Sequence, residues 1–272
     1  VNRGMINATG ANGYVALLAP EVRNEGYVLA TVSSTNAIAL ASGQNITLNF
    51  NGNQLVGVSV NQAVINGLIK NKRLVQVQGG LVVIAAGSVN QLMGSVIQNS
   101  GKVRADSVVS KGGVIELVAS TVTQSGTISA SSQALGGDGG QIRLLGDNIT
   151  LAAGSTTKAQ GASNGGTVNI GTSTVSYTQN GDGTRSNIIA KDLAKTVTVE
   201  SRAIVDVSST QRGNGGEINV WSSERTSVAG TFIAQGGLFG GNGGTIETSS
   251  VGQLSIARVT SVDTSASKGK KG

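Results

Sequence analysis

Apolar and polar residues alternate over short stretches of this chain, and most of these stretches follow a pair of glycines. The glycine doublets begin at residues 79, 112, 139, 165, 215 and 243, which gives spacings of 33, 27, 26, 50 and 28 residues. The second and fourth residues after a doublet are the apolar ones: Val82 and Ile84, Ile115 and Leu117, Ile142 and Leu144, Val168 and Ile170, Ile218 and Val220. Val15 and Leu17 repeat the pattern after Gly13 alone, and the last copy has Ile246 followed by Thr248. Because side chains alternate between the two faces of a strand, each stretch is predicted to be a β-strand with one buried face.

A second repeated pattern has a glycine, an apolar residue two positions later and an alanine two positions after that. It occurs at Gly4–Ala8, Gly26–Ala30, Gly101–Ala105, Gly126–Ala130 and Gly230–Ala234. An amide side chain stands two residues before the first four of these glycines, as Asn2, Asn24, Asn99 and Gln124. Amides at one turn position can stack and hydrogen-bond from one coil to the next, and the turn suits the backbone freedom of Asn and Gly.

Two or three short strands in a period of about 20 to 27 residues, without helical connectors, predict an all-β fold of the solenoid type. We expect a right-handed parallel β-helix (β-solenoid). The spacing of 50 is close to two periods, so one coil between Gly166 and Gly215 is expected to have lost its doublet. Roughly a dozen coils at a strand spacing of 4.8 Å would form a rod on the order of 55 Å long.

The residues that point outward change character along the chain. They are apolar early, as in Tyr14, Leu81 and Val83, and polar later, as in Gln141 and Arg143. This change predicts that an extra-helical hairpin covers the early face. The hairpin is expected near residues 43–71 (Gly43 to Asn71), with strands at Ile46 to Phe50 and Leu55 to Val60. The alternative is a scatter of exposed apolar residues, which is common on protein surfaces.

Composition supports one continuous architecture and excludes several functional classes. The 272 residues include 41 glycines and a single proline (Pro20), with 3% aromatic and 12% charged residues, against about 25% charged in typical domains. The absence of cysteine and histidine excludes disulfides, thiolate metal sites and a histidine base. No segment is apolar enough to span a bilayer, the longest apolar run being of the Leu81–Ala86 kind, and no secretion signal opens the chain, which is therefore either cytosolic or a mature or truncated piece.

The formal net charge of +6 does not indicate nucleic-acid binding. Three of the positive charges lie together at the C-terminus, at Lys268, Lys270 and Lys271. The other cluster is Lys70, Lys72 and Arg73, which has no aromatic stacking partners nearby and is interpreted as a solvated turn.

The segment GYVALLAPEVRNEGYVLA (Gly13 to Ala30) resembles the end of the haemagglutination-activity, or two-partner-secretion, domain of filamentous-haemagglutinin-like exoproteins. GGEINVWSSERTSVAGTFIAQGG (Gly215 to Gly237), NGGTIETSS (Asn242 to Ser250) and VDTSASKGKKG (Val262 to Gly272) are similar to the run that follows that domain. The match is collinear and covers nearly the whole chain. It divides the chain into residues 1–110, the C-terminal part of the secretion domain, and residues 111–272, further Gly-rich β-helix repeats.

This resemblance implies export by a secretion signal and then passage, unfolded, through an outer-membrane β-barrel transporter of the two-partner-secretion type. The Asn-Pro motifs of the family's N-terminal part are absent here, so the chain is expected to begin late in that domain. The implied location is outside the cell or on the bacterial cell surface.

Catalytic β-helices are the alternative class, since some polysaccharide lyases and glycosidases share this architecture. Such enzymes need clustered carboxylates. Glu21 and Glu25 flank a turn, Asp138 and Asp147 lie at opposite ends of one strand, and Asp206 is expected on the surface of a strand. We therefore expect no catalytic residues, no metal and no cofactor.

Four further features carry weak signals. Gly161 to Gly165 matches a nucleophile-elbow pattern but lacks a histidine and a following helix, so a turn is expected. Asp182 has too few acidic neighbours for a calcium site. Asn7, Asn45 and Asn148 begin glycosylation sequons, and Trp221 is expected to pack at a corner rather than serve as a sugar platform.

The main functional hypothesis is a secreted adhesin or haemagglutinin-like filament segment, a rigid scaffold for attachment to cells or surfaces. Its expected partners are the transporter and host-cell or matrix glycans and proteins. The second hypothesis is a carbohydrate- or biofilm-matrix-binding module, with Trp221 and Arg143 as ligand-binding candidates. A polysaccharide-degrading enzyme is the least favoured alternative.

Overall fold

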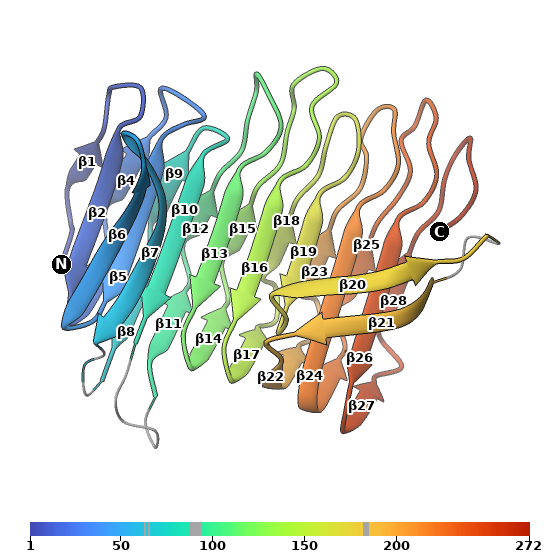
Figure 1. The fold of residues 1–272 in the computed structure, drawn as a ribbon. Helices are drawn as coiled ribbons and strands as arrows, with labels where there is room; N and C mark the ends of the chain where they lie inside the picture. The colour runs from blue at the N-terminus through green and yellow to red at the C-terminus, as the bar shows by residue number, and fades with distance from the viewer. Residues whose placement is uncertain (63, 65, 88–93, 182–184) are drawn as a thin grey trace.

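The computed structural model describes residues 1–62, 64, 66–87, 94–181 and 185–272, and over these residues the chain forms a parallel β-helix. Successive coils stack along one axis, with the two termini at opposite ends (Figure 1). The described residues contain strands and turns and no helix. The all-β fold class is therefore confirmed, and no helix of the described part is available to cross a bilayer.

Each coil contributes three strands, which stack into three parallel ladders. The first ladder has nine strands in the described part of the chain: β1 (Met5–Asn7), β4 (Tyr27–Ala30), β9 (Leu74–Val77), β12 (Lys102–Arg104), β15 (Thr127–Ser129), β18 (Thr156–Lys158), β23 (Ile204–Asp206), β25 (Thr231–Ile233) and β28 (Ser261–Asp263). The second ladder contains β2 (Tyr14–Ala19), β5 (Ala37–Ser42), β10 (Leu81–Ala86), β13 (Val114–Val118), β16 (Gln141–Leu145), β19 (Thr167–Ile170), β24 (Glu217–Val228) and β26 (Thr245–Ser250). The third contains β3 (Glu21–Asn24), β8 (Leu68–Asn71), β11 (Val96–Asn99), β14 (Thr121–Gln124), β17 (Asn148–Leu151), β22 (Ala194–Val199), the end of β24, and β27 (Gln253–Ile256).

The expected dozen coils is wrong, since the first ladder has nine strands in the described part of the chain. The extra coil expected within the spacing of 50 residues is also absent from the pairing of the strands on either side. Thr167 in β19 pairs directly with Glu217 in β24, so these two strands belong to neighbouring coils. The additional residues form a hairpin of β20 (Thr174–Gln179) and β21 (Arg185–Lys191) outside the coil. With nine strands in the first described ladder, the tube is roughly 38 Å long from eight steps of about 4.8 Å.

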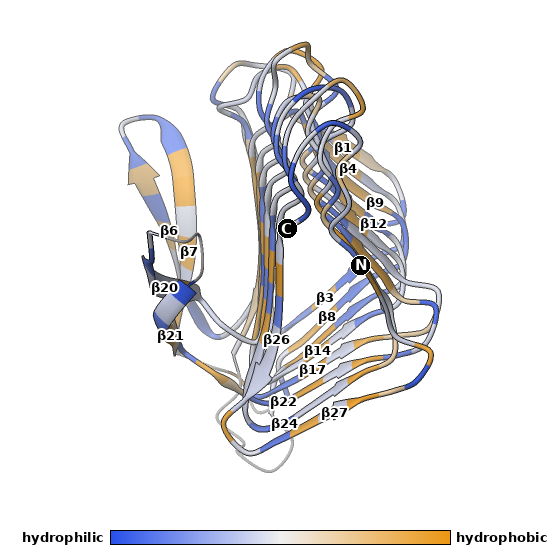
Figure 2. Ribbon diagram, turned by 90° about the vertical axis from the view of Figure 1, so that its right-hand side faces the viewer, coloured by the Kyte–Doolittle hydropathy of each residue, from blue (hydrophilic) through white to orange (hydrophobic). Residues whose placement is uncertain are grey.

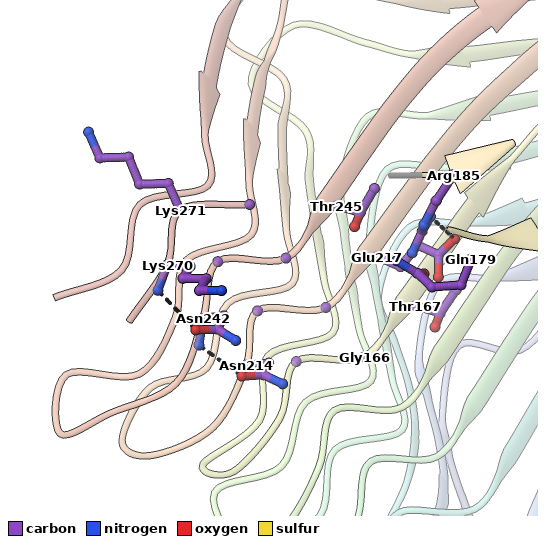
Figure 3. Close-up of a pocket in the computed structure, with 16 residues that line it drawn as sticks. Gly166, Thr167, Gln179, Arg185, Asn214, Glu217, Asn242, Thr245, Lys270 and Lys271 are labelled. Carbon is purple, nitrogen blue, oxygen red and sulfur yellow. Dashed lines mark hydrogen bonds and ion pairs between the residues drawn. The ribbon is translucent and has the colours of Figure 1, made fainter. Parts of the chain in front are cut away.

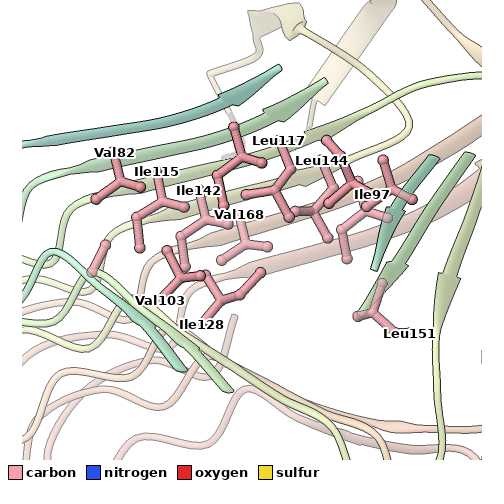
Figure 4. Close-up of a cluster of buried hydrophobic side chains, with 14 of the residues drawn as sticks. Val82, Ile97, Val103, Ile115, Leu117, Ile128, Ile142, Leu144, Leu151 and Val168 are labelled. Atoms are coloured by element: carbon pink, nitrogen blue, oxygen red, sulfur yellow. The ribbon is translucent and has the colours of Figure 1, made fainter. Parts of the chain in front are cut away.

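The inward residues predicted from the alternation fill the tube (Figure 4). Val82, Ile115, Ile142, Val168 and Ile218 pair in register from coil to coil and have no exposed surface. Burying a side chain of this kind contributes roughly 1.5–3 kcal/mol relative to leaving it exposed. A continuous column of branched aliphatic side chains therefore holds adjacent coils together.

The glycine doublets are required where neighbouring coils meet most closely. A Cβ on Gly113 would lie 2.0 Å from the carbonyl oxygen of Gly80 in the preceding coil, and a Cβ on Gly112 would lie 2.0 Å from that of Ala130. The N–H of Gly113 donates to the Ala105 carbonyl at 2.8 Å and closes the coil. The doublet thus marks the closing corner of each coil.

The predicted amide ladder is present and has one more member than expected. Each side-chain amide donates to the oxygen of the next, from Asn2 to Asn24, Asn71, Asn99 and Gln124, over 2.6–2.8 Å. The structure adds Asn71. Arg73 stands where the sequence pattern has glycine, so the pattern missed this coil.

The predicted first hairpin is confirmed, as β6 (Asn45–Asn51) and β7 (Gln54–Gln62). Leu55 is 1% exposed and packs with Ala37 and Ala39 of β5. The rings of Tyr14 and Phe50 meet edge to face with centroids 5.3 Å apart. The hairpin therefore covers the apolar outward columns of the early coils.

Both hairpins lie on the same side of the tube, outside its coils (Figure 2). The second and third ladders run through residue 110 without interruption, from β10 to β13 and from β11 to β14. The β-helix therefore continues past that residue, and the division expected there stays a prediction.

Candidate functional surfaces

The carboxylates that could have served an enzyme each have a local partner. Glu21 pairs with Arg23, and Glu25 pairs with Arg3 at 3.2 Å and Lys72 at 3.1 Å. The hydrogen bond from Lys72 is the main reason that the pKa of Glu25 lies below its usual value. Lys72, one member of the expected solvated cluster, is thus an ion-pair partner.

The two aspartates beside β16 are likewise engaged. Asp147 pairs with Lys195 at 3.5 Å. Asp138 accepts hydrogen bonds from the backbone N–H and the side-chain amide of Asn164, at 2.9 and 3.0 Å. Within the described ranges, no three acidic side chains are grouped in a way that could hold a metal ion.

The expectation that Asp206 lies on the surface is wrong. Its side chain is 8% exposed and accepts hydrogen bonds from the Ser208 N–H at 2.9 Å and from the Gln160 amide at 2.7 Å. Asp263 repeats this arrangement with Ser265 and Gln235, and the Ser265 backbone N–H is the main cause of its lowered pKa. Alternation fails at Asp206 because the strand ends there and the chain turns, so the carboxylate organises the turn.

The stretch from Gly161 to Gly165 is a turn between coils, as expected. Asn164 belongs to a second ladder that the sequence reasoning missed. The side-chain oxygens of Asp138, Asn164, Asn214 and Asn242 each accept the backbone N–H of the residue one coil later, over 2.8–2.9 Å. This second ladder could have been predicted from the sequence, because each of these residues immediately precedes a glycine doublet.

A trough of about 730 Å³ runs beside this second ladder (Figure 3). Its floor is formed by stacked glycine doublets. Arg185 and Glu217, 3.1 Å apart, line one part of it, and Lys270 and Lys271 line its C-terminal end. Since a Cβ on Gly216 would lie 2.0 Å from the Gly166 carbonyl oxygen, coil packing alone requires this smooth floor. The glycine floor of the trough therefore does not by itself indicate a ligand site.

Trp221 is partly buried in β24, and its Nε1 is buried without a hydrogen-bond partner. Arg143 lies on the outward face of β16, where it contacts Glu116 at 3.4 Å and the Gln141 amide oxygen at 3.0 Å. Of the two ligand-binding candidates, Arg143 therefore lies on the outward surface, whereas the polar atom of Trp221 is buried.

The three sequon asparagines, Asn7, Asn45 and Asn148, are all exposed. Asn148 accepts a hydrogen bond from the Thr196 hydroxyl at 2.8 Å. Asp182, considered for calcium, lies outside the described residues.

Comparison with known proteins gives a similarity to a solved structure. No family model and no curated protein matches the chain. Among solved structures, the chain is similar to the HMW1 secretion domain from Haemophilus influenzae, with a TM-score of 0.68 and 25% sequence identity. The alignment covers 94% of this chain and 64% of that one, so the chain spans less than two thirds of the length of the structure it matches. The similarity supports a relation to secreted exoproteins with a β-helical secretion domain, and it does not single out filamentous-haemagglutinin-like members.

Proposed function

We propose that this chain is a β-helical segment of a bacterial two-partner-secretion exoprotein. In this proposal an outer-membrane β-barrel transporter exports the protein, which then acts at the cell surface as a rigid scaffold for attachment. The observation that supports it is the similarity to a secretion domain over 94% of the chain. Residues 1–110 would be the end of the secretion domain and residues 111–272 the start of the repeats that follow.

The contacts within the tube suit this route. Each strand of the first ladder pairs only with the strands of the coils directly before and after it. A coil that has emerged can therefore fold on the one before it, without waiting for the rest of the chain. The absence of cysteine means that no disulfide can form while the chain is still unfolded.

The same contacts suit a rigid scaffold. The inward aliphatic column and the two polar ladders link successive coils along the axis, and the later outward columns are polar. Such a tube can hold other regions away from the cell and present repeated polar faces to cell-surface or matrix partners. No three acidic side chains among the described residues are grouped in a way that could hold a metal ion.

The test uses the intact parent protein in its own bacterium, with antibodies against residues 1–272 as the probe. Deleting the transporter should remove the protein from the cell surface and medium and leave it in the periplasm. Unchanged surface levels would contradict the secretion proposal. Deleting the parent protein should lower adhesion to cells or abiotic surfaces, and restoring it should recover adhesion. Normal adhesion without the protein would reject the attachment role and leave the secretion proposal intact.

A further inference from the structure

The two hairpins meet the tube in different ways. The first hairpin packs Leu55 against Ala37 and Ala39, and the contact is apolar and closed. The second hairpin stands over the polar part of the outward columns, and Ile189 on it is 57% exposed. It is held to the tube by the ion pair of Arg185 with Glu217 and by the hydrogen bond from the Asn169 amide to the Ser173 carbonyl at 3.3 Å; within the hairpin, Arg185 also stacks on the Tyr177 ring at 3.7 Å. Polar contacts therefore hold this hairpin against the coils, and they do not close the space between the hairpin and the outward face of the coils.

A cleft of about 180 Å³ is therefore left between the base of β20 and the outward face of three successive coils. Its sheet side comes from β16, β19 and β24, and its hairpin side includes Ser173, Thr174 and Val175. The volume corresponds to about six water molecules in the liquid, which is room for one sugar ring.

The charges around the cleft are compensated in place. Arg143 lies beside Glu116 at 3.4 Å, and Arg185 pairs with Glu217 at 3.1 Å. Neither guanidinium is left to attract an anion, and the carboxylate of Glu217 is not left to attract a cation. This balance favours an uncharged ligand.

The polar groups of the cleft are also fixed in position. The Asn219 amide donates to Asn169 at 3.0 Å and to Glu217 at 3.1 Å, and Asn169 and Asn219 are both buried. The Gln141 amide is oriented by its bond from Arg143, and Thr167 adds a hydroxyl. The Asn219 side-chain oxygen is buried without a hydrogen-bond partner, and together with the Gln141 amide and the Thr167 hydroxyl it supplies donors and acceptors, which matches sugar hydroxyls that must do both.

We propose that this cleft, between β20 and the outward face of β16, β19 and β24, binds one uncharged sugar residue, a hexose or N-acetylhexosamine of an oligosaccharide. The binding itself does not depend on the export route. Its use in attachment rests on the proposed function and would supply that function with a ligand class. It also revises the sequence-based candidates: Arg143 lines the cleft and Trp221 does not.

The test measures binding of glucose, galactose, N-acetylglucosamine and N-acetylgalactosamine to the purified chain by titration calorimetry and by ligand-observed NMR. Glucuronic acid serves as the charged comparison. Thr174 is exposed on β20 and lines the cleft, so Thr174→Trp should fill it and weaken binding about tenfold or more. Ser176→Trp, at an exposed position of the same strand outside the cleft, is the matched control and should bind like the wild type.

Binding of a neutral sugar that Thr174→Trp abolishes and Ser176→Trp preserves would support the site. Circular dichroism and urea unfolding of both variants should match the wild type, since both positions are exposed. Replacing residues 173–192 by a short Gly-Ser turn gives an independent variant that should also lose binding. No binding of any of the four sugars, equal binding by Thr174→Trp, or preference for glucuronic acid would each overturn the proposal. Export of the parent protein should be unaffected by Thr174→Trp, so failure here and failure of the proposed function are distinguishable.

Discussion

Replacing Asn71 by leucine should destabilise the tube from its interior, because it interrupts the amide ladder. Asn71 accepts a hydrogen bond from the Asn24 amide and donates one to the Asn99 oxygen, each at 2.8 Å. Asn24 and Asn99 have no exposed surface, so water cannot replace the lost partner. An unpaired buried polar group costs about 1–3 kcal/mol. Two such groups would cost roughly 2–6 kcal/mol.

The lower half of that range is expected for Asn71→Leu. The Asn24 amide keeps a longer bond to the Leu74 carbonyl at 3.3 Å, which relieves part of its loss. Leucine has the same branching and the same number of side-chain heavy atoms as asparagine and is larger, so the substitution leaves no cavity. We expect the free energy of unfolding to fall by about 2–4 kcal/mol, a large part of the roughly 5–15 kcal/mol of a typical domain.

Urea unfolding followed by circular dichroism measures the loss, and amide hydrogen exchange locates it. Exchange should accelerate first in β3, β8 and β11, because each coil depends on its neighbours. The control is Asn7→Leu, at an exposed position of β1, which should change stability by less than about 0.5 kcal/mol. A loss below about 1 kcal/mol for Asn71→Leu, or an equal loss for both variants, would refute a stabilising ladder.

Three other substitutions test separate parts of the structure. Burial is the main cause of the raised pKa of Glu247. The stability that the protonated carboxyl contributes to the fold is therefore fully present below the pKa of the unfolded state and is lost as pH rises through the pKa of the folded state. Glu247→Gln should remove this pH dependence of the free energy of unfolding, measured in urea between pH 4 and 8, and an unchanged pH profile would contradict it. Leu55→Ala should weaken docking of the first hairpin by about 2–3 kcal/mol and speed amide exchange in β6 and β7, and slow exchange there would show that Leu55 does not hold the hairpin. Gly113→Ala should lower the melting temperature, since its Cβ would lie 2.0 Å from the Gly80 carbonyl oxygen at the boundary between two coils. Gly10→Ala is the control and should leave the melting temperature unchanged, because no atom lies within 4 Å of its Cβ. Equal melting temperatures of the two variants would rule out this steric requirement.

The strands and the core could be predicted because their cause is local. Alternation after a glycine doublet is visible in a few residues, and it assigned Ile142 and Leu144 inward and Arg143 outward correctly. The first hairpin could also be predicted, because apolar outward residues such as Leu81 need a cover.

The errors arose where spacing was used in place of contacts. A spacing of 50 residues has the same length whether it contains two coils or one coil and a hairpin, and only the pairing of Thr167 with Glu217 decides between them. Asn71 was missed because its coil has Arg73 at the glycine position. The cleft beneath β20 depends on how a hairpin stands over three coils, and no local sequence pattern reports that arrangement.

Both hairpins leave the coil at the same corner, between a strand of the second ladder and the following strand of the third: β5 and β8 for the first, β19 and β22 for the second. Inward side chains and stacked glycines fix the coil on either side of that corner, so an insertion there does not disturb the register. Loop-closure entropy grows slowly with length, by about 0.6 kcal/mol per doubling, so such insertions are tolerated.

What a hairpin does then depends on the outward columns beneath it. Over alanine and leucine it closes the surface, and over amides, hydroxyls and paired charges it leaves a polar cleft. The outward residues, which are not part of the inward aliphatic column, are therefore the part of this chain that can specify a ligand.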